Sequence, residues 1–256
     1  MTRITGHTLI ATTCCRTLYA TPEYGSMNFS AFLCWTDGHK EGSLMPRGGG
    51  LRKCKCGEVY VLWESIKLGI DAEPDTPRTQ FLEAADLPHA VHSSNKTVEL
   101  AARREYWMHL NHEYRDLYRA YREAEDKASQ AKWEADWHAT NPDQRSAFKR
   151  GSDWLLRRKP AGPPTMVDKP FSVPPYQPTQ LQLENMTRLL DLVLEGGNEP
   201  YGPDMLEVAE IYRELGQFDD ARKALNQCPE DDRGTPNKVM EQMIDKAVSA
   251  PVRYRM

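Results

Sequence analysis

The sequence predicts an α+β fold in which a small antiparallel β module is followed by a mainly α-helical region. Short β-type runs separated by turn residues occupy residues 8–63. Residues 100–135 then carry apolar or aromatic side chains at alternating steps of three and four, which is the spacing of one helix face. Residues 205–228 contain two short helical runs joined at Gly216, and this pattern predicts a pair of packed helices.

The composition excludes several classes of protein. The chain has 256 residues, of which 39% are hydrophobic and 27% charged, and its formal net charge is −4. No run approaches the roughly 20 apolar residues of a membrane-spanning helix, and the N-terminal segment lacks the plan of a secretory signal. We therefore expect a cytoplasmic protein with no membrane partner, whose cysteines are thiols. The charge also disfavours binding of nucleic-acid duplexes by the whole chain.

Two connections divide the predicted fold into modules. Residues 71–79 combine prolines and acidic residues without apolar periodicity, which predicts a linker. Residues 159–179 are rich in proline, which cannot continue a helix, so we expect an extended spacer or a strap laid over a neighbour. The modules are then a zinc-ribbon-like β module over 1–70, a long-helix region over 80–158 and a helical bundle over 180–250.

Cysteines gather in the first module. Cys14 and Cys15 are adjacent in one predicted turn, and Cys54 and Cys56 lie in a later turn that Gly57 allows to close tightly. A small antiparallel sheet with two cysteine-bearing turns is the layout of a zinc ribbon, whose metal supplies folding free energy that so small a core lacks. The predicted ligands of a structural zinc ion are Cys14, Cys15, Cys54 and Cys56, with Cys34 and His39 as substitutes.

Two alternatives for these cysteines stay open. Because the side chains of adjacent cysteines diverge, the module can instead be a degenerate ribbon whose cysteines are buried small apolar residues. A disulfide between Cys15 and Cys54 is the third alternative, although a reducing compartment disfavours it.

Short motifs along the chain carry a resemblance. Trp35-Thr36-Asp37-Gly38 stands before the Cys54-Lys55-Cys56-Gly57 turn, and Trp107, Asn111 and Arg115 follow the pattern W-x-x-x-N-x-x-x-R. With these motifs the chain resembles a group of uncharacterised bacterial proteins. That group combines a zinc ribbon containing a W-T/S-D-G motif with helices bearing the second motif and a C-terminal tetratricopeptide-like helical region. The resemblance covers most of the chain and implies this architecture, but it implies no activity.

A long helix, straight or mildly kinked, is predicted from Leu100 to Ala135, where a heptad seam is almost entirely apolar or aromatic. Asn95 or Thr97 is suited to cap its start, and Asn141 precedes the proline that ends it. Large side chains fill the first half of the seam and alanines the second. We expect this helix to pack within the chain, or alternatively to form a homodimer through the Leu100–Ala135 seam.

Another face of the same helix is rich in polar side chains. His109 and His112 are spaced so that they could share a metal ion with neighbouring carboxylates. The carboxylates concerned are Glu105, Glu113 and Asp116. Arginines at helical spacing, such as Arg119 beside Asp116, favour instead a solvated face of ordinary ion pairs.

The C-terminal pattern predicts a tetratricopeptide-like pair. Ala209 and Ala221 are small enough to let two antiparallel helices approach closely, and Gly216 permits the turn between them. Leu183–Leu194 and Val239–Val248 predict flanking amphipathic helices. One such pair falls short of the about three repeats that a solenoid needs, so we expect a small helical bundle.

No arrangement typical of catalysis is present, such as a phosphate-binding glycine loop, a nucleophile elbow or a zinc-protease helix. We therefore expect a non-enzymatic adaptor or scaffold protein that binds a protein partner. A nucleic-acid-binding accessory protein is the first alternative, and it would use basic side chains of the ribbon module. Those side chains are Arg47, Arg52, Lys53 and Lys55. A metalloenzyme that uses the His109/His112 helix face is the second alternative.

Overall fold

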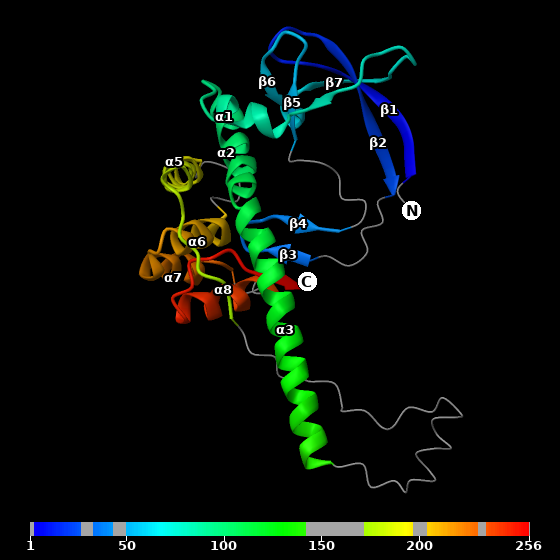
Figure 1. Cartoon of the computed structure of the whole chain (residues 1–256). Helices are drawn as coiled ribbons and strands as arrows, with labels where there is room; N and C mark the ends of the chain where they lie inside the picture. Colours follow the sequence, from blue (N-terminus) through cyan, green and yellow to red (C-terminus); the bar gives the residue numbers. More distant parts are fainter. Residues whose placement is uncertain are drawn as a thin grey trace, which may run out of the picture. The chain divides into compact units, whose positions relative to one another are not determined.

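The computed structural model describes residues 3–26, 33–42, 50–141, 172–196, 204–229 and 234–255. Contacts group the chain into two units, one comprising Met1–His112 with Tyr176–Met256 and the other Glu113–Pro175. Small antiparallel sheets and several helices make up these units, so the predicted α+β class is confirmed (Figure 1). Within the part of the chain described, no helix combines the length and apolar character needed to cross a membrane.

Two of the three sheets belong to the predicted β module. The first has the strand order β2-β1-β7, and the second has the order β6-β5-β8. All pairings are antiparallel, and each sheet is built around a hairpin of consecutive strands. The bounds are β1 Arg3–Ala11, β2 Leu18–Ser26, β5 Leu51–Lys53, β6 Val59–Val61, β7 Ile66–Asp71 and β8 Gln80–Phe81.

A small apolar cluster lies among these strands. Ile10 of β1, Tyr19 of β2, Tyr60 of β6 and Cys54 after β5 are all buried and pack together. Four buried residues remove little apolar surface from water, so this cluster alone contributes only modestly to stability. A second cluster begins at Leu51 and Val61 and continues onto the following helices, which ties the second sheet to them.

The predicted linker at 71–79 is instead part of the β structure. The Ala72 N–H donates to the His7 carbonyl at 2.9 Å, and the Ala20 N–H donates to the Pro77 carbonyl at 2.8 Å. Arg78 forms an isolated bridge with Ala20 before β8 begins. The segment is therefore hydrogen-bonded to β1 at one end and to β2 at the other.

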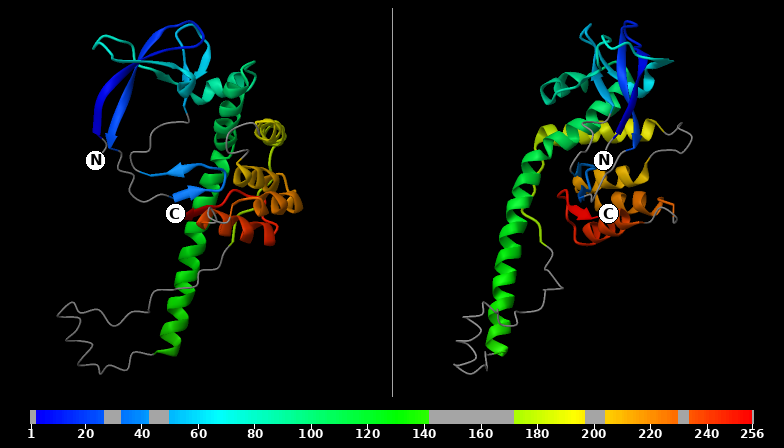
Figure 2. Two further views of the ribbon diagram at one scale, coloured as in Figure 1. Left: turned by 180° about the vertical axis from the view of Figure 1, so that it is seen from behind. Right: turned by 90° about the vertical axis from the view of Figure 1, so that its right-hand side faces the viewer.

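A third sheet joins the N-terminal part of the chain to the last strand. It has the order β4-β3-β9, in which Cys34 of β3 faces Tyr254 of β9. Both views of Figure 2 place the C-terminal strand beside these N-terminal strands. The bounds are β3 Leu33–Trp35, β4 Lys40–Glu41 and β9 Arg253–Arg255. The predicted β module of residues 1–70 therefore does not form one sheet, since β3 and β4 form their sheet with β9, a strand from the opposite end of the sequence.

The predicted long helix is divided at Asn111. Helix α2 (Lys96–Leu110) ends there, and α3 (His112–Thr140) begins at the next residue. The Asn95 side chain accepts hydrogen bonds from the backbone of Thr97 and Val98, so Asn95 is the cap. The heptad pattern runs across Asn111 without a gap, so the periodicity predicted a long helix, straight or mildly kinked, but not the position of the interruption. Two short helical elements precede α2, namely η2 (Ala84–Asp86) and α1 (Leu87–Ala90).

Four helices form the predicted C-terminal bundle. Its core is the largest apolar cluster described, and Ala209 and Ala221 are fully buried where α6 and α7 meet. Gly216 makes the turn between those helices with a φ of 77°. The helical pair and both flanking helices are thus present as predicted. The bounds are α5 Gln180–Glu195, α6 Met205–Glu214, α7 Phe218–Asn226 and α8 Thr235–Asp245.

Gly216→Ala is expected to destabilise the chain by about 1–2 kcal/mol, because an L-residue is strained in the left-handed region. No atom lies within 4 Å of the added methyl group, so the effect is conformational rather than steric. Gly6→Ala is the matched control, since Gly6 also has open space around its Cβ position but no positive φ. Urea unfolding of both variants checks this, and equal losses of stability would contradict the assignment of the turn.

Candidate metal centre

The first cysteine pair lies at the tip of the β1–β2 hairpin. The Thr12 N–H donates to the Thr17 carbonyl at 2.9 Å, and the Arg16 N–H donates to the Thr12 carbonyl at 3.1 Å. Arg16 takes a φ of 58°, in the left-handed region. This tight turn places Cys14 and Cys15 so that their Sγ atoms lie 3.9 Å apart. The turn therefore overcomes the tendency of adjacent cysteine side chains to diverge.

The second pair lies at the tip of the β5–β6 hairpin. The Cys54 N–H donates to the Glu58 carbonyl at 2.8 Å, and the Gly57 N–H donates back to the Cys54 carbonyl at 2.9 Å. Gly57 has a φ of 94° and open space around it. Glycine is needed at this position because the backbone conformation excludes other residues at low energy. The turn brings Cys54 and Cys56 to one side of the loop.

The two hairpin tips meet, and their four sulfur atoms form one cluster. All four Sγ atoms lie within 4.8 Å of one another. Cys15 and Cys54 are 3.4 Å apart, and Cys14 and Cys56 are 3.6 Å apart. A tetrahedral ion with metal–sulfur bonds of about 2.3 Å separates its ligands by about 3.8 Å. The four predicted ligands therefore have the spacing that one tetrahedral metal ion requires.

The surroundings of the cluster act in opposite directions on its thiols. The Thr17 hydroxyl lies 3.0 Å from the Cys15 sulfur, and its hydrogen bond lowers the pKa of Cys15 to about 6. Tyr19 connects the two hairpins, because its hydroxyl accepts from the Lys55 N–H at 2.8 Å and donates to the Cys54 sulfur at 3.8 Å. Loss of solvation raises the pKa of Cys14 to about 12.

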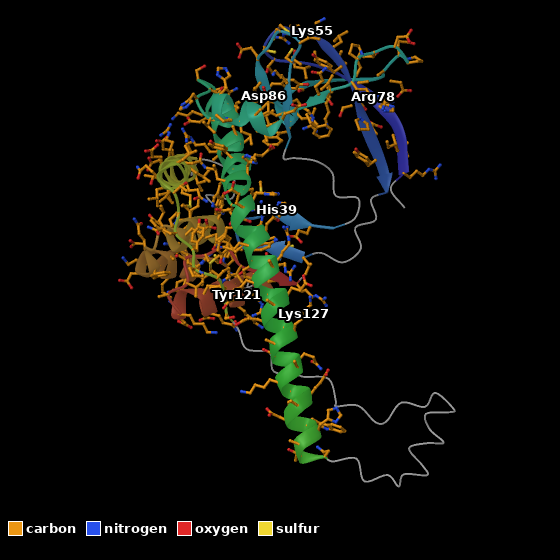
Figure 3. The ribbon with its side chains drawn as sticks, in the orientation of Figure 1. His39, Lys55, Arg78, Asp86, Tyr121 and Lys127 are labelled. Atoms are coloured by element: carbon orange, nitrogen blue, oxygen red, sulfur yellow. The ribbon has the colours of Figure 1, made fainter. Side chains whose placement is uncertain are left out.

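The proposed substitutes lie elsewhere. Cys34 is buried in β3, and His39 follows in the turn that leads to β4. Figure 3 labels His39 beside these strands and Lys55 at the cysteine-bearing turn, well apart from it. Among the described residues, the only group of three or more candidate ligands is the four-cysteine cluster. Cys34 and His39 are thus not brought to the cluster.

The other two interpretations of the cysteines fit the geometry less well. Cys54 is buried, but Cys14, Cys15 and Cys56 are exposed, so these three are not packed as small apolar residues. All six cysteines are free thiols. The distance of 3.4 Å between the Cys15 and Cys54 sulfurs is well beyond the length of a disulfide bond, which is about 2.05 Å.

The histidine face does not assemble a site in the described structure. His109 and His112 are both exposed, and His109 stacks on Tyr106 with ring centroids 6.3 Å apart. Neither belongs to a group of three candidate ligands within the described ranges. Asp116 pairs with Arg119 as the helical spacing predicted.

The basic side chains of the module are dispersed. Lys53 forms an ion pair with Asp86 at 2.6 Å, while Lys55 is exposed beside the cysteines. Arg52 is only 7% exposed, and Arg47 lies outside the described residues. These four positions therefore do not present one continuous basic surface in the part of the chain described.

The two tryptophan motifs meet at a separate, buried polar network. The Asn111 amide donates to Asp37 at 3.1 Å and to Glu214 at 3.2 Å, and the Trp107 indole N–H donates to Glu214 at 2.9 Å. Tyr176, near the end of the proline-rich segment, donates to Asn111 at 3.2 Å. The residues of W-T-D-G and W-x-x-x-N thus hold the third sheet, α2 and α6 together.

Sequence reasoning missed the acidic half of this network. Glu210 and Arg213 form a bidentate pair with distances of 2.7 and 2.5 Å, and both are almost fully buried. Glu214 is 1% exposed, and burial raises its pKa well above the usual value, with Glu210 and Asp37 adding to the effect. Consecutive charged residues on a predicted helix resemble a solvated face, so only tertiary structure reveals that these are buried.

Comparison with known proteins adds no assignment, since no family model, no curated protein and no solved structure matches the chain. The proposed role therefore depends on the geometry of the chain itself.

Proposed function

We propose that the chain is a non-enzymatic interaction protein in which a structural zinc ion joins the tips of the β1–β2 and β5–β6 hairpins. The observation that carries this proposal is the convergence of four cysteine sulfurs from two separate hairpins. A tetrahedral ion with four thiolate ligands keeps no open position for water or substrate, so such a centre is structural rather than catalytic. Four sulfur ligands suit zinc or iron, and the ribbon-like hairpins favour zinc.

The metal would supply the folding free energy that the β module lacks. The cluster of Ile10, Tyr19, Cys54 and Tyr60 is small, and two of its members contact the cysteine turns directly. Structural zinc sites in small modules contribute apparent binding free energies of about 10–16 kcal/mol. Burial of four side chains contributes at most about 6–12 kcal/mol, so the metal would contribute as much as this cluster or more.

A helical surface is the candidate contact for the partner. Helix α3 has exposed residues in the second half of the heptad seam, and Leu117 is 53% exposed. The other exposed seam positions are alanines, whose small side chains permit the close approach of another helix. These alanines are Ala124, Ala128, Ala131 and Ala135. The proposed partner is therefore a helix, belonging either to another protein or to a second copy of this chain.

One pair of variants tests this contact. Ala128→Glu places a charge in the seam, whereas Ser129→Glu places the same charge at the next position, about 100° around the helix. Crosslinking of the full-length chain in extracts of its own cells should capture the same polypeptide with the parent and with Ser129→Glu, but not with Ala128→Glu. Sedimentation equilibrium of the purified chain identifies a homodimer. Equal capture by all three chains would contradict the proposal.

A further inference from the structure

A cavity of ≈ 810 Å³ lies in the β module, apart from the cysteine cluster. Its lining comes from both sheets and from the segments that connect them. Four large apolar side chains around it are unusually exposed: Ile4 (51%), Tyr24 (46%), Trp63 (61%) and Phe81 (44%). The volume falls within the range of about 300–1,000 Å³ that is typical of small-molecule sites. Exposed apolar side chains gathered around one hollow indicate a binding surface.

Trp63 is held against the chain by a glycine. A Cβ atom at Gly50 would lie 2.1 Å from Cζ3 of the Trp63 indole, closer than any contact allows. Gly50 also takes a φ of 69°, which glycine adopts without strain. The indole therefore lies directly on the backbone at Gly50, while most of its surface stays exposed beside the cavity. An aromatic face presented in this way suits stacking with a planar ring.

Arg52 provides a buried positive charge at the same cavity. Its guanidinium lies 4.0 Å from the centre of the Phe81 ring, and its Nη1 donates to the Leu51 carbonyl at 2.8 Å. The Nε–H is buried without a hydrogen-bond partner, and no ion pair within the described part of the chain includes Arg52. Burial lowers the pKa of Arg52, although the Glu105 carboxylate opposes this. A cation buried without a bound carboxylate is unfavourable unless an anion satisfies it.

Two further cations and one carboxylate line the cavity. Lys67 and Arg78 are exposed and line it with Arg52. Figure 3 labels Arg78 beside the strands of the first sheet. Glu23 is the one carboxylate among the lining residues of the described chain, and it accepts a hydrogen bond from Thr8. The lining thus combines aromatic faces with three cations, which suits a ligand that is both planar and anionic.

We propose that this cavity binds a nucleotide, with the base stacked on Trp63 and the phosphate held by Arg52, Lys67 and Arg78. The nucleotide is either a free mononucleotide or one residue of a single-stranded nucleic acid, since both present the same base and phosphate. This site differs from the basic surface predicted from the sequence, because it binds its ligand through stacking and one buried guanidinium rather than through a row of exposed cations. The net negative charge of the chain disfavours duplex binding, but it does not oppose binding at a local site of this kind.

Binding to the full-length chain tests the proposal with two probes. Fluorescence anisotropy of a labelled oligodeoxyadenylate of about ten nucleotides reports the single strand, and calorimetric titration with AMP reports the mononucleotide. Trp63→Ala is expected to weaken binding by about ten- to hundredfold, because it removes the stacking surface. Trp63→Phe should recover part of the loss. Trp137→Ala, on α3, is the matched control and should bind as the parent does.

A second set of variants tests the phosphate contacts. Lys67→Ala and Arg78→Ala should each reduce the slope of log K against log salt by about one for the oligonucleotide. Arg52→Met keeps a similar volume without the charge, so it should lose binding while its thermal midpoint stays equal or rises.

The two probes also separate the two sources of the ligand. AMP binding that depends on Trp63 supports a free nucleotide, and binding of the oligonucleotide alone supports a single strand. The proposal is overturned if neither probe binds the folded parent chain, or if binding is unchanged in Trp63→Ala.

Discussion

Cys54→Ser is expected to remove zinc from the full-length chain and to unfold the β1–β2 and β5–β6 hairpins. Serine cannot replace a thiolate ligand, and the remaining three sulfurs no longer complete a tetrahedron. Because metal binding contributes directly to folding free energy, the loss should be several kcal/mol, the largest effect of any single substitution in the module. Zinc content measured by mass spectrometry and the thermal midpoint of unfolding check this result. Cys14→Ser should behave in the same way.

Cys34→Ser is the matched control for this experiment. Cys34 and Cys54 are both 2% exposed, so each substitution buries a hydroxyl group and loses similar packing. Cys34 lies in β3, away from the cluster, so its variant should retain zinc at the parent's stoichiometry. A chelator should then lower the thermal midpoint of the parent and of Cys34→Ser, but not that of Cys54→Ser. Zinc retained in Cys54→Ser would contradict the assignment of the ligands.

In the parent chain, the free energy of unfolding is expected to fall as pH rises, and Glu214→Gln is expected to remove much of that fall. Burial raises the pKa of Glu214 in the folded chain well above its ordinary value of 4.5. Above pH 4.5 the unfolded chain releases this proton while the folded chain retains it, so stability falls as pH rises toward the folded pKa. The slope is at most about 1.4 kcal/mol per pH unit over the range in which the folded chain retains this proton and the unfolded chain does not. Glutamine has no proton to lose, so the stability of the Glu214→Gln variant should change less with pH than that of the parent.

The neighbours of Glu214 define the controls. Glu210, Asp37, Arg213 and Tyr176 all act on its charge, so the parent's profile contains more than one titration. The difference between the parent and Glu214→Gln isolates the one carboxyl group. Urea unfolding of both chains between pH 5 and 8 measures this difference in the free energy of unfolding. Glu241→Gln removes an exposed carboxylate, so it should leave the dependence of stability on pH unchanged.

Glu214→Leu separates charge from hydrogen bonding in the same network. Leucine also has no proton to lose, but it leaves the Trp107 indole N–H and the Asn111 amide without the acceptor that Glu214 provides. Each unsatisfied buried donor costs about 1–3 kcal/mol, so this variant should be destabilised at every pH. Equal profiles for the parent, the glutamine variant and the leucine variant would show that Glu214 is not protonated in the folded chain.

Local features of the sequence predicted the hairpins and the cysteine cluster. Gly57 and the cysteines around it specify a tight turn through backbone conformation alone, and the Thr12–Thr17 turn is equally local. The helical pair at Gly216 was also predicted because its two helices are joined by a short turn. Within each turn the interacting groups are separated by a few residues, so the pattern of residue types contains the necessary information. The two cysteine turns lie about 40 residues apart in the sequence, and their pairing followed from the layout of a zinc ribbon rather than from local pattern.

Features that depend on distant contacts were not predictable. The pairing of Cys34 with Tyr254 joins the two ends of the sequence, and a strand of three residues carries no signal for its partner. The break at Asn111 is likewise tertiary, because the side chain of Asn111 binds Asp37 and Glu214. Arg52 illustrates the same limit. An arginine in this module predicted an exposed basic surface, but the side chain of Arg52 is buried and lines the cavity.

Zinc X-ray absorption of the purified full-length chain tests the central claim most directly. The fine structure reports the identity of the ligands and their distances from the metal. The four-cysteine centre predicts one zinc ion per chain with four sulfur neighbours at about 2.3 Å. Nitrogen or oxygen atoms in the first coordination shell, fewer than four sulfurs, or a metal other than zinc would contradict it.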